Sequence, residues 1–102
     1  METEDELERL AWVVAFSVSM YGCLERTWKP FNPILGETFE YADAEKGYWY
    51  FGEQVSHHPP IGAGHAESVR GWSYSITSAP ETKFLGNSIE IYAVGRTRIV
   101  LK

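Results

Sequence analysis

Residues 53–60 read Glu-Gln-Val-Ser-His-His-Pro-Pro, and the rest of the chain is interpreted outward from this segment. The aromatic run Tyr-Trp-Tyr-Phe at 48–51 leads into it and predicts a strand. The two prolines cannot donate backbone hydrogen bonds, so we expect strand pairing to stop at them. In an extended chain, successive side chains point to opposite faces. His57 and His58 can therefore meet one ligand only if the chain bends here, and the prolines favour such a bend.

Three further blocks accompany this segment. Residues 29–38 read Lys-Pro-Phe-Asn-Pro-Ile-Leu-Gly-Glu-Thr, 61–67 read Ile-Gly-Ala-Gly-His-Ala-Glu, and 82–88 read Thr-Lys-Phe-Leu-Gly-Asn-Ser. In this order and spacing, the four blocks resemble the oxysterol-binding protein-related family of lipid-transfer proteins. The resemblance covers nearly the whole chain. Two long motifs in register are far more specific than a short pattern such as a lone glycine-rich loop.

The resemblance implies an α+β fold in which an N-terminal helix precedes an antiparallel β-meander. In the family, this meander is part of an incomplete β-barrel that encloses a lipid tunnel. The family's ligand-binding domain is several times longer than 102 residues. Residues 96–102 alternate like a strand, with no turn or cap after them. We therefore expect residues 1–102 to be one part of such a ligand-binding domain.

The resemblance further implies lipid binding without catalysis and without a cofactor. The expected activity is non-vesicular transfer between membranes, with phosphatidylinositol 4-phosphate and a sterol exchanged in one hydrophobic tunnel. Some members of the family carry another lipid instead of the sterol. A lipid sensor or scaffold that binds the same headgroup without net transport remains an alternative. The expected location is the cytoplasm, with peripheral attachment to membranes such as endoplasmic reticulum contact sites.

The resemblance also places a site for the phosphorylated headgroup at the tunnel mouth. A lysine offers a positive charge with three donors, and protonated imidazoles offer two donors each, which suits the acceptor oxygens of a phosphate. We expect tighter binding at mildly acidic pH, because protonation adds charge and donors. The family supplies further charged groups from a later helical segment, so we expect the site to be incomplete in this chain. The residues that match the family's site are Lys29, Pro30, Phe31, Asn32, His57, His58 and Thr82.

Composition narrows the choice of partners. The formal net charge is −5, whereas a nucleic-acid partner requires a basic face. The acidic balance also argues against attachment to an anionic membrane by charge alone. No stretch approaches the roughly 20 apolar residues that span a bilayer, and the acidic N-terminus does not resemble a secretory signal. Cys23 is the single cysteine, so no internal disulfide can form.

Hydrophobic periodicity predicts a helix over 3–21, with a capping box made by Thr3 and Glu6 and a stop at Gly22. Apolar residues surround this helix, so we expect it to be buried against a sheet, with partial contact with lipid as the alternative. Short strands separated by turn signals indicate a meander or barrel. The predicted strands cover 36–42, 47–55, 61–68, 72–78, 83–94 and 97–102.

Aromatic side chains on the strands are candidates for the wall of an apolar tunnel. Core packing is the more common role of such residues, and the sequence does not tell which face points inward. Gly62 and Gly64 share one face of a strand, where they leave room for a ligand or mark a bulge or corner. The candidates for the wall are Phe39, Tyr41, Trp49 and Phe51.

A metal site and a hydrolase site are rival interpretations of the histidines. Adjacent histidines rarely fit one tetrahedral zinc ion, and no cysteine pair supports such a site. Ser56 and His57 are neighbours in sequence, which seldom gives the geometry of a nucleophile and its base, and no G-x-S-x-G motif occurs. Without the resemblance, the expected role of the paired histidines would be that of satisfied corner residues. The metal candidates are His57, His58, His65, Glu53 and Glu67.

Overall fold

An aspartate caps the N-terminal helix. The computed structural model describes residues 3–25 and 32–102, and the chain forms two units, Met1–Phe31 and Asn32–Lys102. In the first unit, α1 (Glu6–Ser19) follows Asp5. The Oδ1 atom of Asp5 accepts hydrogen bonds from the backbone N–H groups of Leu7 at 2.8 Å and Glu8 at 3.3 Å. These two bonds satisfy donors that the first turn of a helix leaves without backbone partners.

Three predictions about this helix are wrong. Thr3 is not the cap, because its hydroxyl donates to Glu8 Oε2 at 2.6 Å, and this bond is the main reason that the pKa of Glu8 is lowered. The α-helix ends at Ser19 and continues as the 3₁₀-helix η1 (Met20–Glu25), so Gly22 lies inside a helical segment and does not stop it. No residue of α1 is buried, and Leu7 is 77% exposed. Within the described residues, no helix combines the length and the apolar character needed to cross a bilayer.

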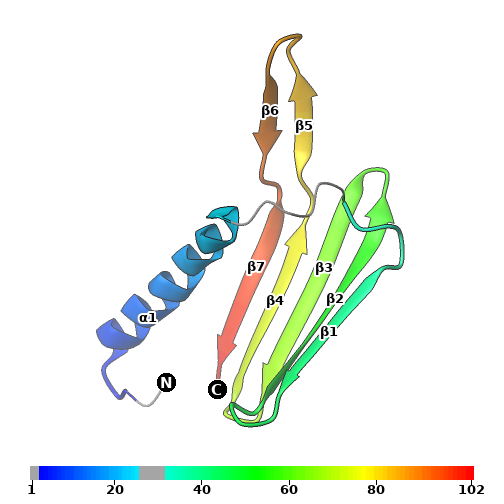
Figure 1. Cartoon of the computed structure of the whole chain (residues 1–102). Helices are drawn as coiled ribbons and strands as arrows, with labels where there is room; N and C mark the ends of the chain where they lie inside the picture. Colours follow the sequence, from blue (N-terminus) through cyan, green and yellow to red (C-terminus); the bar gives the residue numbers. More distant parts are fainter. Residues whose placement is uncertain (1–2, 26–31) are drawn as a thin grey trace. The chain divides into compact units, whose positions relative to one another are not determined.

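The second unit is an antiparallel meander with one hairpin inserted into it. Five strands pair in the order β1-β2-β3-β4-β7, and two more form a separate hairpin between β4 and β7 (Figure 1). The hairpin projects beyond the end of the sheet in Figure 1. The predicted strand 83–94 is therefore two strands. The bounds are β1 Thr38–Asp43, β2 Tyr48–His57, β3 Pro60–Ser68, β4 Trp72–Ser78, β5 Glu81–Phe84, β6 Ile89–Tyr92 and β7 Gly95–Leu101.

A polar turn at residues 43–47 connects β1 to β2. Asp43 Oδ1 accepts from the backbone N–H of Lys46 at 2.9 Å, and this hydrogen bond is the main reason that the pKa of Asp43 is lowered. Gly47 has a φ of +68°, a conformation that costs a residue with a side chain more than it costs glycine. The turn aligns Asp43 with Tyr48 and so fixes the register of the whole β1–β2 pair.

The register sorts the side chains of the sheet onto two faces, because directly opposed residues of an antiparallel pair lie on the same face. We call one the ring face; on it, ring centroids lie 5.7 to 6.1 Å apart between Phe39 and Tyr50, Tyr41 and Tyr48, and Tyr48 and Trp72. The buried side chains Ala66, Gln54 and Ser68 also belong to it. We call the other the charged face. The ring face carries Phe39, Tyr41, Tyr48, Tyr50, Trp72 and Tyr74, and the charged face carries Glu40, Trp49, Phe51, Glu53, His65, Glu67, Arg96 and Arg98.

The space beside the glycines of β3 is filled by the sheet itself. Gly64 is directly opposite Gly52 on β2. The Tyr50 side chain occupies the position that a side chain on Gly64 would take, since a Cβ atom there would meet its hydroxyl and would lie 3.1 Å from Ile76 Cγ2. At Gly62 the nearest atom, Gln54 Oε1, would be 3.5 Å away, which is an ordinary contact. Gly64 is therefore required for ring packing, whereas Gly62 is not.

This difference gives a stability prediction. Gly64→Ala should displace the Tyr50 ring and lower the free energy of unfolding by roughly 1–3 kcal/mol, the usual cost of overpacking. Gly62→Ala, two residues away on the same strand, should change it by less than about 1 kcal/mol. Urea denaturation of the two variants and the parent protein measures both effects. Equal midpoints for the two variants would contradict the packing described for Tyr50.

Candidate functional site

The two neighbouring histidines lie together at the end of β2. Their ring centroids are 4.7 Å apart and the ring planes make an angle of 64°. His57 is half-buried and His58 is exposed. The expected bend is present, because β2 and β3 are joined by a turn of only two residues, His58 and Pro59, whose peptide bond is cis. The pairing does not stop at the prolines as predicted: β2 extends to His57, which pairs with Pro60 as the first residue of β3.

A β-bulge precedes the histidines, and its extra residue shifts the alternation of the side chains that follow on β2. Gln54 pairs with Gly62 and Ser56 with Ile61, so Val55 is the extra residue on β2. A bulge leaves backbone groups without ladder partners. The buried Gln54 side chain compensates for this, because its Nε2 donates to the carbonyl oxygen of Ser56 at 2.9 Å. This bond holds the peptide group that immediately precedes His57.

Backbone hydrogen bonds attach the segment that precedes β1 to the same place. Gly36 N–H donates to Gln54 O at 2.9 Å, and Gln54 N–H donates to Glu37 O at 3.0 Å. The segment is closed by a local turn in which the N–H of Ile34 donates to Glu37 Oε2 at 3.0 Å. Gly36, with a φ of +76°, belongs to this turn, so β1 begins at Thr38 and not at the predicted residue 36.

One contact joins this segment directly to the histidine pair. The Nδ1 atom of His57 lies 3.2 Å from the carbonyl oxygen of Pro33. Asn32 is the residue before Pro33, so the chain brings this predicted site residue next to the imidazoles. Lys29, Pro30 and Phe31 continue the same segment and lie outside the described residues. The structure therefore brings His57 and His58 together, and Asn32 immediately precedes the residue whose carbonyl oxygen His57 contacts.

Thr82 lies in a different environment from the histidines. It is on β5, directly opposite Ile91 on β6. The same face of the hairpin carries Phe84 and Ile89, whose exposed fractions are 71% and 62%. The hairpin starts at the same end of the sheet as the histidine turn, because Ser78 at the end of β4 pairs with Gly62 near the start of β3. No described interaction joins Thr82 to either histidine.

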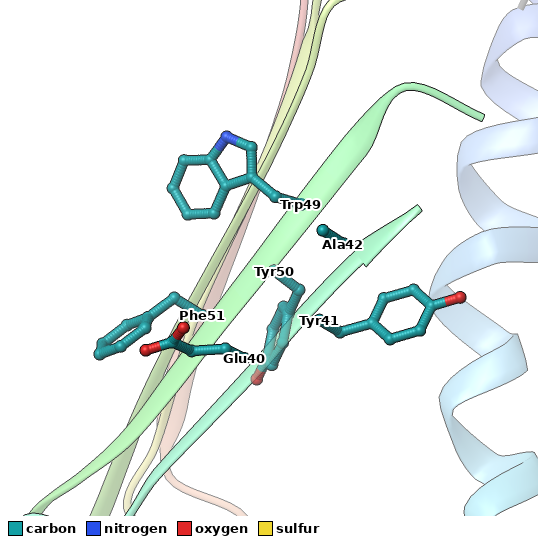
Figure 2. Close-up of a pocket in the computed structure, with 6 residues that line it drawn as sticks. All are labelled: Glu40, Tyr41, Ala42, Trp49, Tyr50 and Phe51. Carbon is teal, nitrogen blue, oxygen red and sulfur yellow. The ribbon is translucent and has the colours of Figure 1, made fainter. Parts of the chain in front are cut away.

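The four aromatic candidates for the wall cannot all line one cavity. Phe39 and Tyr41 belong to the ring face, whereas Trp49 and Phe51 belong to the charged face. Figure 2 shows Trp49 and Phe51 projecting away from the sheet on the side opposite Tyr41. An open hollow of about 420 Å³ involves Glu40, Tyr41, Ala42, Trp49, Tyr50 and Phe51. Because a tunnel lined by one face of the sheet uses one pair, either Phe39 and Tyr41 or Trp49 and Phe51 can belong to its wall.

The third histidine is separate from the turn. His65 lies in the middle of β3 opposite Phe51, where its Nδ1 is 2.8 Å from Ser75 Oγ and its ring centroid is 5.5 Å from that of Trp49. Among the residues that the structure describes, no three histidine, cysteine, aspartate or glutamate side chains are grouped so as to hold a metal ion. His57 directs Nδ1 to the Pro33 carbonyl, so this nitrogen is not available as a base for Ser56.

Sequence reasoning missed Gln54 and Pro33 as parts of the site. Gln54 stands inside the central segment, but its importance depends on the bulge, and no residue at 53–57 marks a bulge unambiguously. Pro33 contributes through its carbonyl oxygen, a group that every residue carries. The one usable signal was the adjacency of the two histidines, which requires an irregularity if both rings are to face one ligand.

The geometry defines a small corner on an antiparallel sheet, made from a histidine pair and the segment before β1. The family model described as oxysterol-binding protein matches residues 1–102. The chain therefore belongs to the oxysterol-binding protein family. It is 54% identical over 101 residues to oxysterol-binding protein-related protein 3B of Arabidopsis thaliana, covering 99% of this chain and 22% of that protein.

Solved structures match as well. A crystal structure of the Osh1 ORD domain in complex with cholesterol has a TM-score of 0.84 and 44% identity, over 98% of this chain and 24% of that one. The Osh3 ORD from Saccharomyces cerevisiae in complex with PI(4)P has a TM-score of 0.71 and 41% identity, over 90% of this chain and 26% of that one. These matches confirm the predicted fold class. The chain spans about a quarter of these solved domains.

Proposed function

We propose that this chain contributes the headgroup end of a lipid-binding domain that exchanges phosphatidylinositol 4-phosphate and a sterol between membranes. The proposal rests on the contact between the His57–His58 pair and the segment before β1, in which His57 Nδ1 lies next to the carbonyl oxygen of Pro33. Relatives of the same fold are described in complex with PI(4)P and with cholesterol. The proposed role is binding and transfer, with no catalysis and no cofactor.

The chemistry of the corner suits a phosphate monoester. Such a group carries about 1.5 to 2 negative charges at neutral pH and three acceptor oxygens. Lys29 would supply a charge with three donors, and each imidazole would supply ring N–H donors. Pro30, Phe31 and Asn32 would line the site beside them. Thr82 lies on the β5–β6 hairpin, which begins at this end of the sheet, so the hairpin would have to bring Thr82 to the phosphate.

The second lipid requires a dry wall with few polar groups. Either Phe39 and Tyr41 or Trp49 and Phe51 would line it, because the two pairs lie on opposite faces. Exchange would proceed in one tunnel, with one lipid taken up at one membrane and released at another in favour of its competitor. The proposed location is the cytoplasm, with peripheral contact with membranes such as those of endoplasmic reticulum contact sites.

Transfer between liposomes tests this proposal on an intact domain that contains the chain. With phosphatidylinositol 4-phosphate in one population and sterol in the other, we expect both lipids to move and each to accelerate the other. Lys29→Ala should slow phosphoinositide transfer about tenfold or more, because it removes a charge-assisted contact worth roughly 1.5–3 kcal/mol.

Lys46→Ala is the matched control, because Lys46 is exposed and pairs with Asp43 in the turn that precedes β2. It should leave both transfer rates unchanged. Binding of both lipids to the wild-type domain without any movement between liposomes would favour a sensor or scaffold. A domain that binds neither lipid would end the proposal.

A further inference from the structure

Gln54 is a buried polar residue that bonds to the chain close to each partner of the His57–Pro33 contact. Its side chain is 7% exposed and donates to Ser56 O, which holds the peptide group preceding His57. Its backbone accepts from Gly36 and donates to Glu37, which holds the segment that carries Pro33. A buried amide with fixed partners is a rigid attachment, because breaking its bonds leaves unsatisfied polar groups. Gln54 thus determines where the imidazole of His57 and its carbonyl acceptor meet.

We propose that Gln54 is a positioning residue that makes His57 a proton-dependent donor to the phosphate. This inference rests on the proposed function, because it assigns a mechanism to the same headgroup site. The direction in which the His57 ring is held decides which of its nitrogens can face a phosphate.

The Pro33 contact fixes which nitrogen of His57 carries a hydrogen. A carbonyl oxygen only accepts hydrogen bonds, so His57 Nδ1 must be the N–H donor in the 3.2 Å contact. In the neutral ring, Nε2 then carries a lone pair and is an acceptor. A phosphate oxygen is also an acceptor, so neutral His57 offers it no hydrogen bond. Only the imidazolium form donates through Nε2 while keeping the bond to Pro33.

His58 differs from His57 in this respect. It is exposed, and among the described residues its only interaction is the ring contact with His57. No acceptor in the described part of the chain holds either nitrogen, so the neutral ring can adopt the tautomer that donates to a phosphate. The two adjacent imidazoles therefore have different roles, one that requires a proton and one that does not.

Within residues 3–25 and 32–102, few titratable groups lie on the elements next to His57. The segment before β1 brings Glu37, β2 brings Glu53, and the turn brings His58. The first five residues of β3, 60–64, bring none. Glu37 already accepts from the Ile34 N–H. The arrangement predicts that binding of the phosphate takes up a proton through His57.

Calorimetry of the intact domain tests this, with glycerophosphoinositol 4-phosphate as the soluble probe. Titration at pH 7.5 and 5.5, in buffers of different ionisation enthalpy, gives the affinity and the number of protons taken up. The phosphate itself titrates near pH 6, so each variant is compared with the wild type using the same probe. We expect His57→Asn, whose amide can still donate to Pro33, to lower the affinity at both pH values and to reduce the proton uptake.

Gln54→Met removes the side-chain donor while keeping a buried side chain of similar length. It should release His57 from its fixed orientation, lower the affinity about five- to tenfold at pH 5.5, and reduce the proton uptake towards that of His57→Asn. A residue with only a structural role would lower the affinity equally at both pH values and leave the proton uptake at the wild-type value. That outcome would overturn the inference.

A second variant of Gln54, and the measurements on His57→Asn and the wild-type domain, allow the inference to be tested even if one variant does not fold. Gln54→Glu is nearly isosteric, but its carboxylate cannot donate to Ser56 O, and it should behave like Gln54→Met at pH 7.5. If both Gln54 variants fail to fold, wild-type proton uptake in His57→Asn would still overturn the inference. Failure of the wild-type domain to bind the probe would instead overturn the proposed function itself.

Discussion

Replacing both histidines of the turn, as His57→Ala together with His58→Ala, is expected to lower the affinity of the intact domain for phosphatidylinositol 4-phosphate by about 10²–10⁴-fold. Each ring is proposed to make a charge-assisted hydrogen bond worth roughly 1.5–3 kcal/mol, and the variant removes two of them. The effect should be this large because the rings lie only 4.7 Å apart and can act on one phosphate.

The same variant should leave sterol affinity within about twofold of the wild type, because a sterol offers a hydroxyl and no phosphate. His65→Ala is the matched control for the loss of an imidazole. His65 bonds to Ser75 in the middle of the sheet, so the phosphoinositide affinity should stay within about twofold. Liposome binding of the two variants measures both quantities. Equal losses of phosphoinositide affinity in the double variant and in His65→Ala would contradict the assignment of the site.

The second large effect is expected at the first residue of β7. Gly95 has a φ of +148°, and a Cβ atom there would collide with the carbonyl oxygen of Thr77 on β4. Gly95→Ala would therefore combine backbone strain with overpacking, at a total cost of about 3–5 kcal/mol. Because small domains are stable by only about 5–15 kcal/mol, this substitution should detach β7 from β4 or prevent folding.

Gly71→Ala separates the two contributions. Gly71 has a φ of +83°, but the nearest atom to a Cβ there, Lys102 Cβ, would be 3.6 Å away. This variant should show the strain alone, about 1–2 kcal/mol. Chemical denaturation of both variants gives the comparison. If Gly95→Ala were no less stable than Gly71→Ala, the close approach of β7 to Thr77 would be wrong.

Local signals in the sequence were sufficient for most of the sheet. Strict alternation of large and small residues predicts β4 at 72–78, and the structure confirms those bounds. The Asp-Ala-Glu-Lys-Gly segment at 43–47 is a turn signal of the same local kind, because its aspartate accepts a backbone hydrogen bond and its glycine has a positive φ. The range 83–94, predicted as one strand, is a hairpin of two strands, with Gly86 and Asn87 in the connection between them.

The remaining errors concern features that depend on distant residues. Burial of α1 was inferred from composition, but burial is decided by what covers a surface, and no residue of α1 is buried here. The sequence did not tell which aromatic side chains share a face, because the register that places Phe39 and Trp49 on opposite faces is fixed by the turn between β1 and β2. Residues 33–37 are joined to the end of β2 by hydrogen bonds of Gln54 and His57, whose partners are distant in sequence.

The most direct test of the account is a crystal structure of the intact domain with glycerophosphoinositol 4-phosphate bound. We predict that the 4-phosphate lies within hydrogen-bond distance of Lys29 Nζ and of one ring nitrogen from each of His57 and His58, with His57 Nδ1 still on the Pro33 carbonyl. A phosphate bound elsewhere, or a Lys29 ammonium on a surface away from both rings, would contradict it.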